Sequence, residues 1–431
     1  MELFFSVGEP SGDLHGANLI RHLRRLHPGI RCVGYGGPRM AAAGLELHAD
    51  LTALAVMWFL RVLWNIHRFG QLLVQADRCF RHRRPDAVVL IDYPGFNWWI
   101  ARRAKAHGIP VFYYGTPQMW AWAGWRVRKM RRLVDHVLCK LPFEPAWFRA
   151  RGCHATYVGH PYFDETTTRR LDDPFLRDQA ARPGVLVTIL PGSRGQEVTQ
   201  NLPAFLRAAE RVRQSVPEAR FAVASFNADQ AACARRLVAA ARLPVEVYVG
   251  RTPELIEAAR CCLACSGSVS LELLHHTRPA VVVYTISRAA LVVQRFFRKA
   301  RYITLVNLLA AREPFVHDGR VHDPDAPGAE PVPYPEYLTC EDRSAPIAAH
   351  LVRWLTNPAA HAACVAQLER LKAAYGHPGA SARAADYVLA RLRERRPRVL
   401  RPHFLPGRAT LHAGAGDARD AGPLREETCP C

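Results

Sequence analysis

Two charged residues stand directly after apolar, strand-like runs of the sequence. Asp92 follows the run 87–91, and Arg194 follows the run 185–190. An ionisable group at the carboxyl end of a buried parallel strand faces the ligand crevice of an α/β protein, which would make Asp92 a general base. An Asp that caps the next helix explains the same position equally well. Arg194, preceded by Ser193 and flanked by glycines, suits a diphosphate, because a guanidinium binds phosphate oxygens through charged hydrogen bonds.

Two further loops offer small and acidic residues where a strand-like run gives way to a helix. In the segment GEPSGD at 8–13, the charge of Glu9 suits sugar hydroxyls better than phosphate. By itself this segment is better explained as a tight turn with its own helix cap. In the second loop, Glu272 follows the small residues SGS at 266–268, and a carboxylate there can accept hydrogen bonds from both hydroxyls of a ribose. A capping box with an incidental Glu is the alternative.

The cysteines do not predict a metal site. Cys262 and Cys265 form a CxxC pair, but no second pair and no histidine pair follows at zinc spacing. The N-terminal residues run into a strand pattern without a basic and apolar leader, which predicts a protein that is not exported. We therefore expect a cytoplasmic protein without a metal or other cofactor, whose 12 cysteines are mostly small buried apolar side chains.

The elements that must hold these loops alternate between short apolar runs and helical patterns. Such alternation is typical of a parallel, doubly wound sheet. The pattern begins again near residue 185, which predicts two Rossmann-like halves facing across a ligand cleft at the carboxyl ends of their strands. The expected strands are Leu3–Val7, Arg31–Tyr35, Ala87–Ile91, Val111–Tyr114, Val185–Leu190, Phe221–Ala224, Val245–Val249, Cys262–Ala264 and Ala280–Tyr284.

The length of 431 residues is too great for one ordinary core, so we expect two α/β domains. The first spans residues 1–165 and the second 166–397, with the boundary in the polar stretch 166–183. A loop rich in Pro, Gly and Asp is expected at 316–335. Beyond residue 397 the composition turns to Arg, Gly, Ala and Pro without an apolar period, which predicts a disordered basic tail over 398–431.

The net charge of +20, from 58 Lys and Arg against 38 Asp and Glu, predicts an acidic partner. Nucleic acid is not expected, because the arginines are scattered and not interleaved with aromatics on one face.

The segment 56–74 predicts an amphipathic helix that lies flat on anionic lipid and is too often interrupted by charge to span a bilayer. An ordinary buried helix is the alternative. The predicted membrane-docking residues are Trp58, Phe59, Val62, Leu63, Trp64 and Ile66.

Ten motifs in a fixed order give the chain a family resemblance. They include GE-x-SGD at 8–13, GGP-x-M at 36–40, ID-x-P-x-FN at 91–97, PQMWAW at 117–122, LPF-E at 141–144, GHP at 159–161, LPGSRG-x-EV at 190–198, SGS-x-S-x-E at 266–272 and NLLA at 307–310. Over about residues 3–390 the chain resembles the lipid A disaccharide synthases, which are inverting glycosyltransferases of the GT-B architecture. A different GT-B enzyme that acts on a UDP-sugar, such as a UDP-N-acetylglucosamine epimerase, is the competing interpretation.

The resemblance implies a reaction. The family transfers 2,3-diacylglucosamine from UDP-2,3-diacylglucosamine to 2,3-diacylglucosamine 1-phosphate and needs no metal. A position on the inner face of the inner membrane and a homodimer are also expected from it. Gly95 stands where the family often has Asp, so a second carboxylate is missing and Asp92 carries more of the chemistry.

The resemblance also implies roles for individual residues. Asp92 would be the general base, and Arg194 would bind the diphosphate of UDP. The other residues of the implied UDP pocket are Ser193, Ser266, Gly267, Ser268, Glu272 and Asn307, and those that would face the sugars are Glu9, Ser11 and Gly12.

Overall fold

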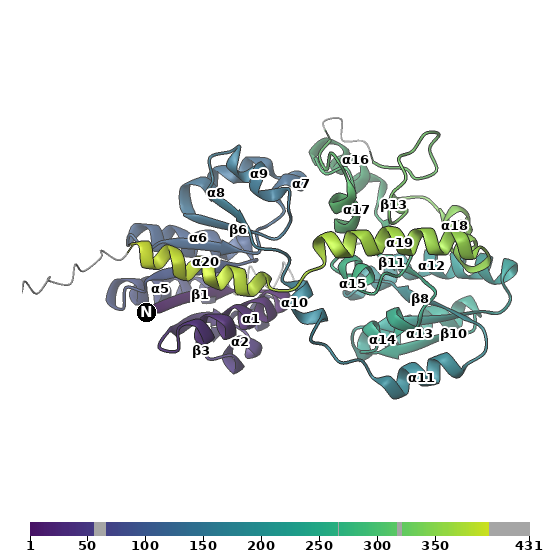
Figure 1. Cartoon of the computed structure of the whole chain (residues 1–431), viewed down its shortest axis with the longest axis horizontal. Coiled ribbons are helices and arrows are strands. Elements are labelled where there is room, and N and C mark those ends of the chain that lie inside the picture. The colour runs from purple at the N-terminus through teal and green to yellow at the C-terminus, as the bar shows by residue number, and fades with distance from the viewer. Residues whose placement is uncertain (56–65, 266, 317–320, 396–431) are drawn as a thin grey trace, which may run out of the picture.

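The computed structural model describes residues 1–55, 66–265, 267–316 and 321–395. These residues form two α/β lobes that lie side by side along the long axis of the molecule (Figure 1). Each lobe is built on its own parallel sheet, which confirms the expected architecture of two doubly wound halves. Most of the strands are apolar and buried because helices cover both faces of each sheet.

The first lobe is built on a sheet with seven parallel strands in the part of the chain that the structure describes. They are β1 (Glu2–Val7), β2 (Arg31–Gly36), β3 (Leu45–Asp50), β4 (Ala87–Ile91), β5 (Val111–Tyr114), β6 (His136–Cys139) and β7 (Ala155–Tyr157). They lie in the order β3-β2-β1-β4-β5-β6-β7. The winding direction therefore reverses between β1 and β4, and this switch point is where doubly wound proteins bind ligands.

Helices cover the first sheet. They are α1 (Pro10–Leu26), α2 (Pro38–Ala42), α3 (Leu51–Ala55), α5 (Ile66–His82), α6 (Pro94–Ala106), α7 (Met119–Trp122), the 3₁₀ helix η1 (Gly124–Arg126), α8 (Val127–Leu133), α9 (Glu144–Arg149) and α10 (Tyr162–Thr166). The part of the expected helix 56–74 that the structure describes begins at Ile66 and belongs to α5. The predicted membrane-docking residues Trp58, Phe59, Val62, Leu63 and Trp64 lie outside the described residues. Within the described ranges, every helix is too short or too polar to cross a bilayer.

The second lobe repeats this plan. Its strands are β8 (Val185–Leu190), β9 (Ala219–Ser225), β10 (Val245–Val249), β11 (Cys261–Cys265), β12 (Ala280–Thr285) and β13 (Glu336–Thr339), in the order β10-β9-β8-β11-β12-β13. The switch point lies between β8 and β11. The helices are α11 (Asp173–Ala181), α12 (Gly195–Ser215), α13 (Ala228–Ala241), α14 (Thr252–Ala258), α15 (Val269–His275), α16 (Arg288–Phe297), α17 (Leu305–Ala310), α18 (Ser344–Thr356) and α19 (Pro358–Tyr375).

Nine of the observed strands match the predicted runs, but β3, β6, β7 and β13 were not predicted. Strand β3 is half exposed along its length, so its side chains do not form a continuous apolar run. Strands β6, β7 and β13 have only three or four residues each. Each also contains a polar residue, unlike the similarly short β5, so each shows too little apolar pattern to be recognised without its neighbours in the sheet.

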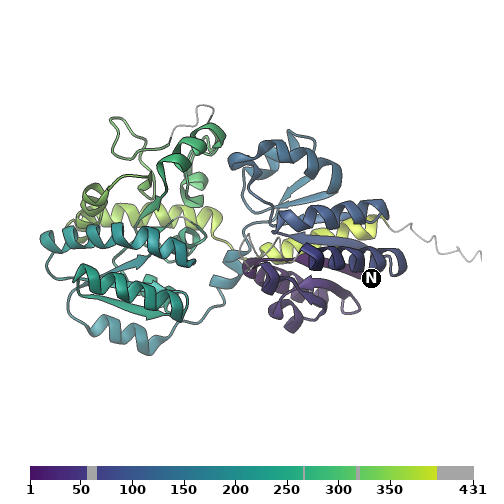
Figure 2. The same ribbon diagram turned by 180° about the vertical axis from the view of Figure 1, so that it is seen from behind.

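The last helix of the described residues, α20 (Ala380–Arg395), packs along α1. The two opposite views place this yellow helix on the first lobe, although it follows the second lobe in the chain (Figures 1 and 2). Asp164 at the end of the first lobe caps this helix, because its carboxylate accepts the backbone N–H groups of Gly379, Ala380 and Ser381 at 2.6, 3.1 and 2.8 Å. The Tyr114 hydroxyl lies 3.3 Å from that of Ser381. The chain therefore crosses between the lobes twice, before α11 and after α19.

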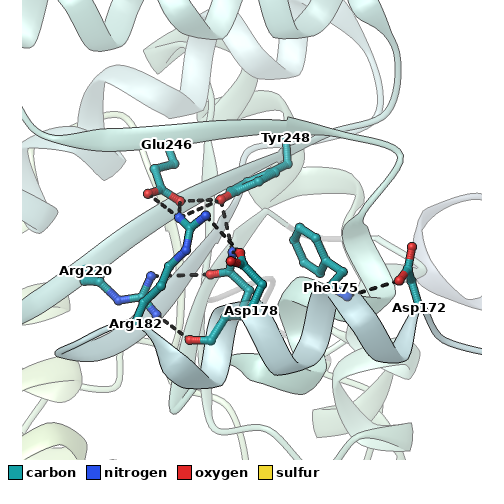
Figure 3. A network of polar contacts seen from close by, with 8 residues as sticks. Asp172, Phe175, Asp178, Arg182, Arg220, Glu246 and Tyr248 are labelled. Carbon is teal, nitrogen blue, oxygen red and sulfur yellow. Dashed lines mark hydrogen bonds and ion pairs between the residues drawn. The ribbon is translucent and has the colours of Figure 1, made fainter.

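A polar network fastens α11, the first helix after the crossing, to the edge of the second sheet (Figure 3). Arg182 pairs with Glu246 of β10 at 2.7 Å. Gln179 donates to the Tyr248 hydroxyl at 3.1 Å, and its backbone carbonyl accepts from Arg220 of β9 at 3.0 Å. An isolated ion pair on the surface contributes little to stability, but several charged and polar side chains in one network hold their positions better. The network therefore leaves the short segment 167–172 as the link between α10 and the anchored α11.

Candidate active site

Asp92 lies in a strained turn at the carboxyl end of β4. Asp92 and Tyr93 have φ angles of 46° and 44°, in a region that residues with side chains rarely adopt. Two hydrogen bonds hold the turn, because the backbone carbonyl of Asp92 accepts from the Tyr113 hydroxyl at 2.7 Å and from the Asn97 amide at 2.8 Å. These contacts hold the backbone of the turn from which the Asp92 side chain extends.

The Asp92 carboxylate lies among residues that follow β1, β5 and β6. Lys140 Nζ is 3.4 Å from Asp92 Oδ1. A Cβ atom added to Gly12 would lie 3.7 Å from a carboxylate oxygen, and one added to Gly115 would lie 3.4 Å from one, so both glycines approach the group closely. The structure thus brings Gly12 and Asp92 together at the switch point of the first sheet, and Lys140 joins them.

Lys140 is held at its backbone and at its ammonium group. Its backbone N–H donates to Glu144 Oε2 at 2.8 Å, and Glu144 also accepts from the Trp120 indole at 2.9 Å. Burial by itself would lower the pKa of Lys140, but the carboxylates of Asp92 and Glu144 outweigh burial, and the pKa is raised above its usual value. Lys140 therefore places a permanent cation beside Asp92 at neutral pH.

Glu9 interacts electrostatically with charged residues of both lobes. Burial and the nearby Asp92 carboxylate raise the pKa of Glu9, while the cations of Lys140 and Arg194 act in the opposite direction. Arg194 belongs to the second lobe, so loops of both lobes contribute charge to one region. Ser11 is exposed at the start of α1 in the same loop as Glu9. These side chains are polar and accessible enough to meet sugar hydroxyls.

The loop before α12 is ordered by its own carboxylate. Glu197 accepts the backbone N–H groups of Ser193 and Arg194 at 2.9 and 3.1 Å. Gly192 has a φ of 132°, and a Cβ atom there would lie 2.4 Å from the Cβ of Glu197, so the turn needs a glycine. The Arg194 side chain is 82% exposed and makes a 3.4 Å contact with Glu197. It is therefore accessible to a phosphate at the N-terminus of α12.

A cavity of about 1300 Å³ opens beside this loop, at the switch point of the second sheet. Glu272 lies in its wall and is largely buried. The Glu272 carboxylate accepts from Arg169, in the link between the lobes, at 2.6 Å. Of the residues predicted to bind UDP, the cavity is lined by Ser193, Arg194, Gly267, Ser268 and Glu272.

Asn307 is placed differently from these residues. It is buried, and its amide nitrogen donates to the Tyr334 carbonyl at 2.7 Å and to Glu336 at 2.8 Å. Its amide oxygen accepts from the Tyr334 N–H at 3.0 Å. Asn307 is not among the described residues that line the cavity, and its contacts join α17 to the start of β13. Ser266 lies outside the described residues.

Part of the predicted site lies outside the cavity. Glu9, Ser11, Gly12 and Asp92 are not among its described lining residues. They lie beyond Arg194, on the first lobe, so the two groups of site residues form adjoining halves. Within the described part of the chain, no three His, Cys, Asp or Glu side chains gather closely enough to hold a metal ion.

Comparison with known proteins identifies the family. The family model for lipid-A-disaccharide synthetase matches residues 3–317. The chain belongs to the lipid-A-disaccharide synthase family. A lipid-A-disaccharide synthase from Anaeromyxobacter dehalogenans strain 2CP-1 is 38% identical over 395 residues, which cover 91% of this chain and 98% of the relative. The synthase from Myxococcus xanthus is 34% identical, with coverages of 89% and 95%.

Solved structures share the fold of this lipid-A-disaccharide synthase family member. A UDP-GlcNAc 2-epimerase from Neisseria meningitidis, bound to UDP-GlcNAc, matches with a TM-score of 0.59 at 12% identity and covers 90% of this chain and all of its own, 100%. MurG from Acinetobacter baumannii matches with a TM-score of 0.52 at 11% identity, with coverages of 90% and 99%. At such low identity these matches show the fold alone, and they confirm the expected GT-B architecture.

Two charged residues of the site were not identified from the sequence of this family member. Lys140 directly follows β6, one of the strands that were not predicted, so its position at a strand end was hidden. Arg169 lies in the polar stretch between the lobes, where a sequence pattern assigns no contact. A rule that examines each charged residue after a short apolar run would have found Lys140 after His136–Cys139.

Proposed function

We propose that the chain transfers 2,3-diacylglucosamine from UDP-2,3-diacylglucosamine to 2,3-diacylglucosamine 1-phosphate, with inversion and release of UDP. The observation that carries the proposal is membership of the lipid-A-disaccharide synthase family over residues 3–317. The site supports it, because Asp92 and Arg194 come from opposite lobes and both act on Glu9 electrostatically. An inverting transfer needs a base on one side of the reacting carbon and positive charge on the other.

The proposed roles follow from these positions. Asp92 accepts the proton of the acceptor hydroxyl as that oxygen attacks the anomeric carbon of the donor. Arg194 and the N-terminus of α12 stabilise the negative charge on the departing diphosphate. Glu272, at the far wall of the cavity, accepts hydrogen bonds from the ribose hydroxyls. Lys140 is a positioning residue whose ammonium group holds the Asp92 carboxylate in place.

Replacing Lys140 by Met tests this positioning role. Lys140→Met removes the ammonium group that lies 3.4 Å from Asp92 Oδ1. A hydrogen bond to a charged group is worth about 1.5–3 kcal/mol, so we expect kcat to fall about tenfold or more, with part of the loss recovered in Lys140→Arg, which keeps the positive charge. The matched control is Lys105→Met, which removes a lysine paired with Asp135 at 2.8 Å on the surface. A kcat near that of the parent in a folded Lys140→Met protein would contradict the role.

We also infer that the protein works on an anionic membrane surface at the inner face of the inner membrane. The net charge of +20 supports this, since juxtamembrane cations are attracted to anionic lipid. The acyl chains of both proposed substrates place them in a membrane. A homodimer is proposed from the family resemblance alone.

The proposed reaction is tested with purified protein and the two proposed substrates. The expected product is a disaccharide monophosphate that appears with UDP in equal amounts, measured by mass spectrometry. Equal yields with and without EDTA are expected, because Arg194 and α12 supply the positive charge near the diphosphate. A UDP-sugar isomer in place of a disaccharide would overturn the proposal.

A further inference from the structure

The cavity that contains Arg194 and Glu272 also has an apolar end. Trp122 and Trp125 from α7 and η1 of the first lobe line it, together with Val293 and Phe297 from α16 of the second. These four side chains are 50, 58, 55 and 51% exposed. Single exposed apolar residues are common, but several in one cavity indicate a site for an apolar ligand.

The two walls of the apolar end are held near each other. The rings of Trp125 and Phe297 have their centroids 6.4 Å apart. The Lys299 N–H, just after α16, donates to the carbonyl of Ala121 in α7 at 2.7 Å. A backbone hydrogen bond thus joins the lobes beside the apolar end, so its width is set by the fold and not only by side-chain motion.

Helix α16 presents an apolar surface that the described protein does not bury. None of its side chains over 288–297 is buried. The helix is nevertheless fixed at both ends. Ser287 accepts from the Ala290 N–H at 3.2 Å, and the buried Arg298 donates to the carbonyls of Ala300 and Arg301 at 2.8 and 2.6 Å. An ordered helix with an unburied apolar surface is suited to bind an apolar ligand.

We propose that the apolar end of the cavity is a groove for one acyl chain of the donor substrate. This inference rests on the proposed function. In that donor, the diphosphate and the acyl groups are attached to neighbouring carbons of the same sugar, so a chain must leave the sugar close to Arg194. Trp122, Trp125, Val293 and Phe297 line the same cavity as Arg194. Its volume of about 1300 Å³ exceeds that of ordinary small-molecule pockets and leaves room for a chain beside a nucleotide.

The positions of the exposed side chains on α16 distinguish a groove from a simple surface patch. Val292 and Phe296 are 57 and 74% exposed, as much as or more than Val293 and Phe297, but they are not among the described lining residues of the cavity. A flat membrane contact would use all four residues. A groove for one chain uses only the pair that faces the cavity. Val292 and Val293 can therefore be compared as a matched pair of positions, and so can Phe296 and Phe297.

The test compares Val293→Trp with Val292→Trp, using donors that carry long or short acyl chains in detergent micelles. A Trp at 293 would fill the groove, so we expect the KM for a long-chain donor to rise about tenfold or more, which corresponds to loss of about two buried methylene groups. The KM for a short-chain donor and the affinity for UDP, measured by calorimetry, should change by less than about twofold. Val292→Trp should behave as the parent with both donors.

Four results would overturn the groove. Equal effects of both tryptophans would indicate a surface contact, and a loss that does not depend on chain length would indicate a general disturbance. A matching loss of UDP affinity would assign the residue to the nucleotide. If Val293→Trp does not fold, Phe297→Ser compared with Phe296→Ser carries the same contrast. A parent protein that makes no disaccharide would refute the proposed function, whereas an active parent with an unaffected Val293→Trp would refute only the groove.

Discussion

Asp92→Asn is expected to lower kcat by about 10²- to 10⁴-fold, the range that a general base contributes. The substitution preserves the size of the side chain but leaves no group that can accept the acceptor's proton. The turn that carries residue 92 should persist, because Tyr113 and Asn97 bind its backbone carbonyl and not its carboxylate. UDP affinity should stay near that of the parent, since Arg194 and Glu272 are unchanged.

The matched control for this variant is Asp135→Asn. Asp135 also pairs with a lysine, Lys105, at 2.8 Å, and its other oxygen accepts from the Val111 N–H at 2.8 Å. It lies at the opposite end of the sheet from Asp92, since it precedes β6 where Asp92 follows β4. Single-turnover assays with both variants separate chemistry from product release. Activity of Asp92→Asn within about tenfold of the parent would remove Asp92 as the base.

Arg194→Ala is expected to weaken UDP binding by about 1.5–3 kcal/mol, the contribution of a hydrogen bond to a charged group. That loss corresponds to about a 10- to 150-fold rise in Kd, measured by calorimetry. The fold should be unaffected, because the Arg194 side chain is 82% exposed and the loop is held through its backbone by Glu197. Arg194→Lys should recover only part of the affinity, because an ammonium group cannot bind two phosphate oxygens side by side.

Arg207→Ala is the matched control for Arg194→Ala. Arg207 lies further along the same helix, α12, and pairs with Asp342 at 3.1 Å on the surface. Removing it takes one positive charge from the same helix without changing the cavity. Similar losses of UDP affinity in both variants would mean that Arg194 acts through overall charge and not by contact with the diphosphate.

Much of the fold follows from local pattern. The runs at Ala87–Ile91, Val111–Tyr114, Val185–Leu190 and Val245–Val249 became β4, β5, β8 and β10 with the predicted bounds. Strands β4, β5 and β8 are buried almost throughout, so their apolar character is continuous and visible in the sequence, whereas β10 is only partly buried and is recognised by its β-branched valines. Strand β6 is as short as β5 but begins with the polar His136, so its apolar run is shorter still, and Lys140 was missed with it. A motif predicts Asn307 near the nucleotide. In the structure its side-chain amide makes hydrogen bonds with Tyr334 and Glu336, which no local pattern predicts.

The sequence by itself determined the two doubly wound lobes, the family and the polar loops after β1, β4, β8 and β11, because apolar periodicity and turn residues are local properties. Tertiary structure decided which of these loops meet. Lys140 reaches Asp92 across 48 residues, and Arg169 reaches Glu272 across 103. The contact between the rings of Trp125 and Phe297 likewise exists only because the two lobes touch there. Contacts of this kind depend on strand order and on packing between lobes, which no local pattern of residues records.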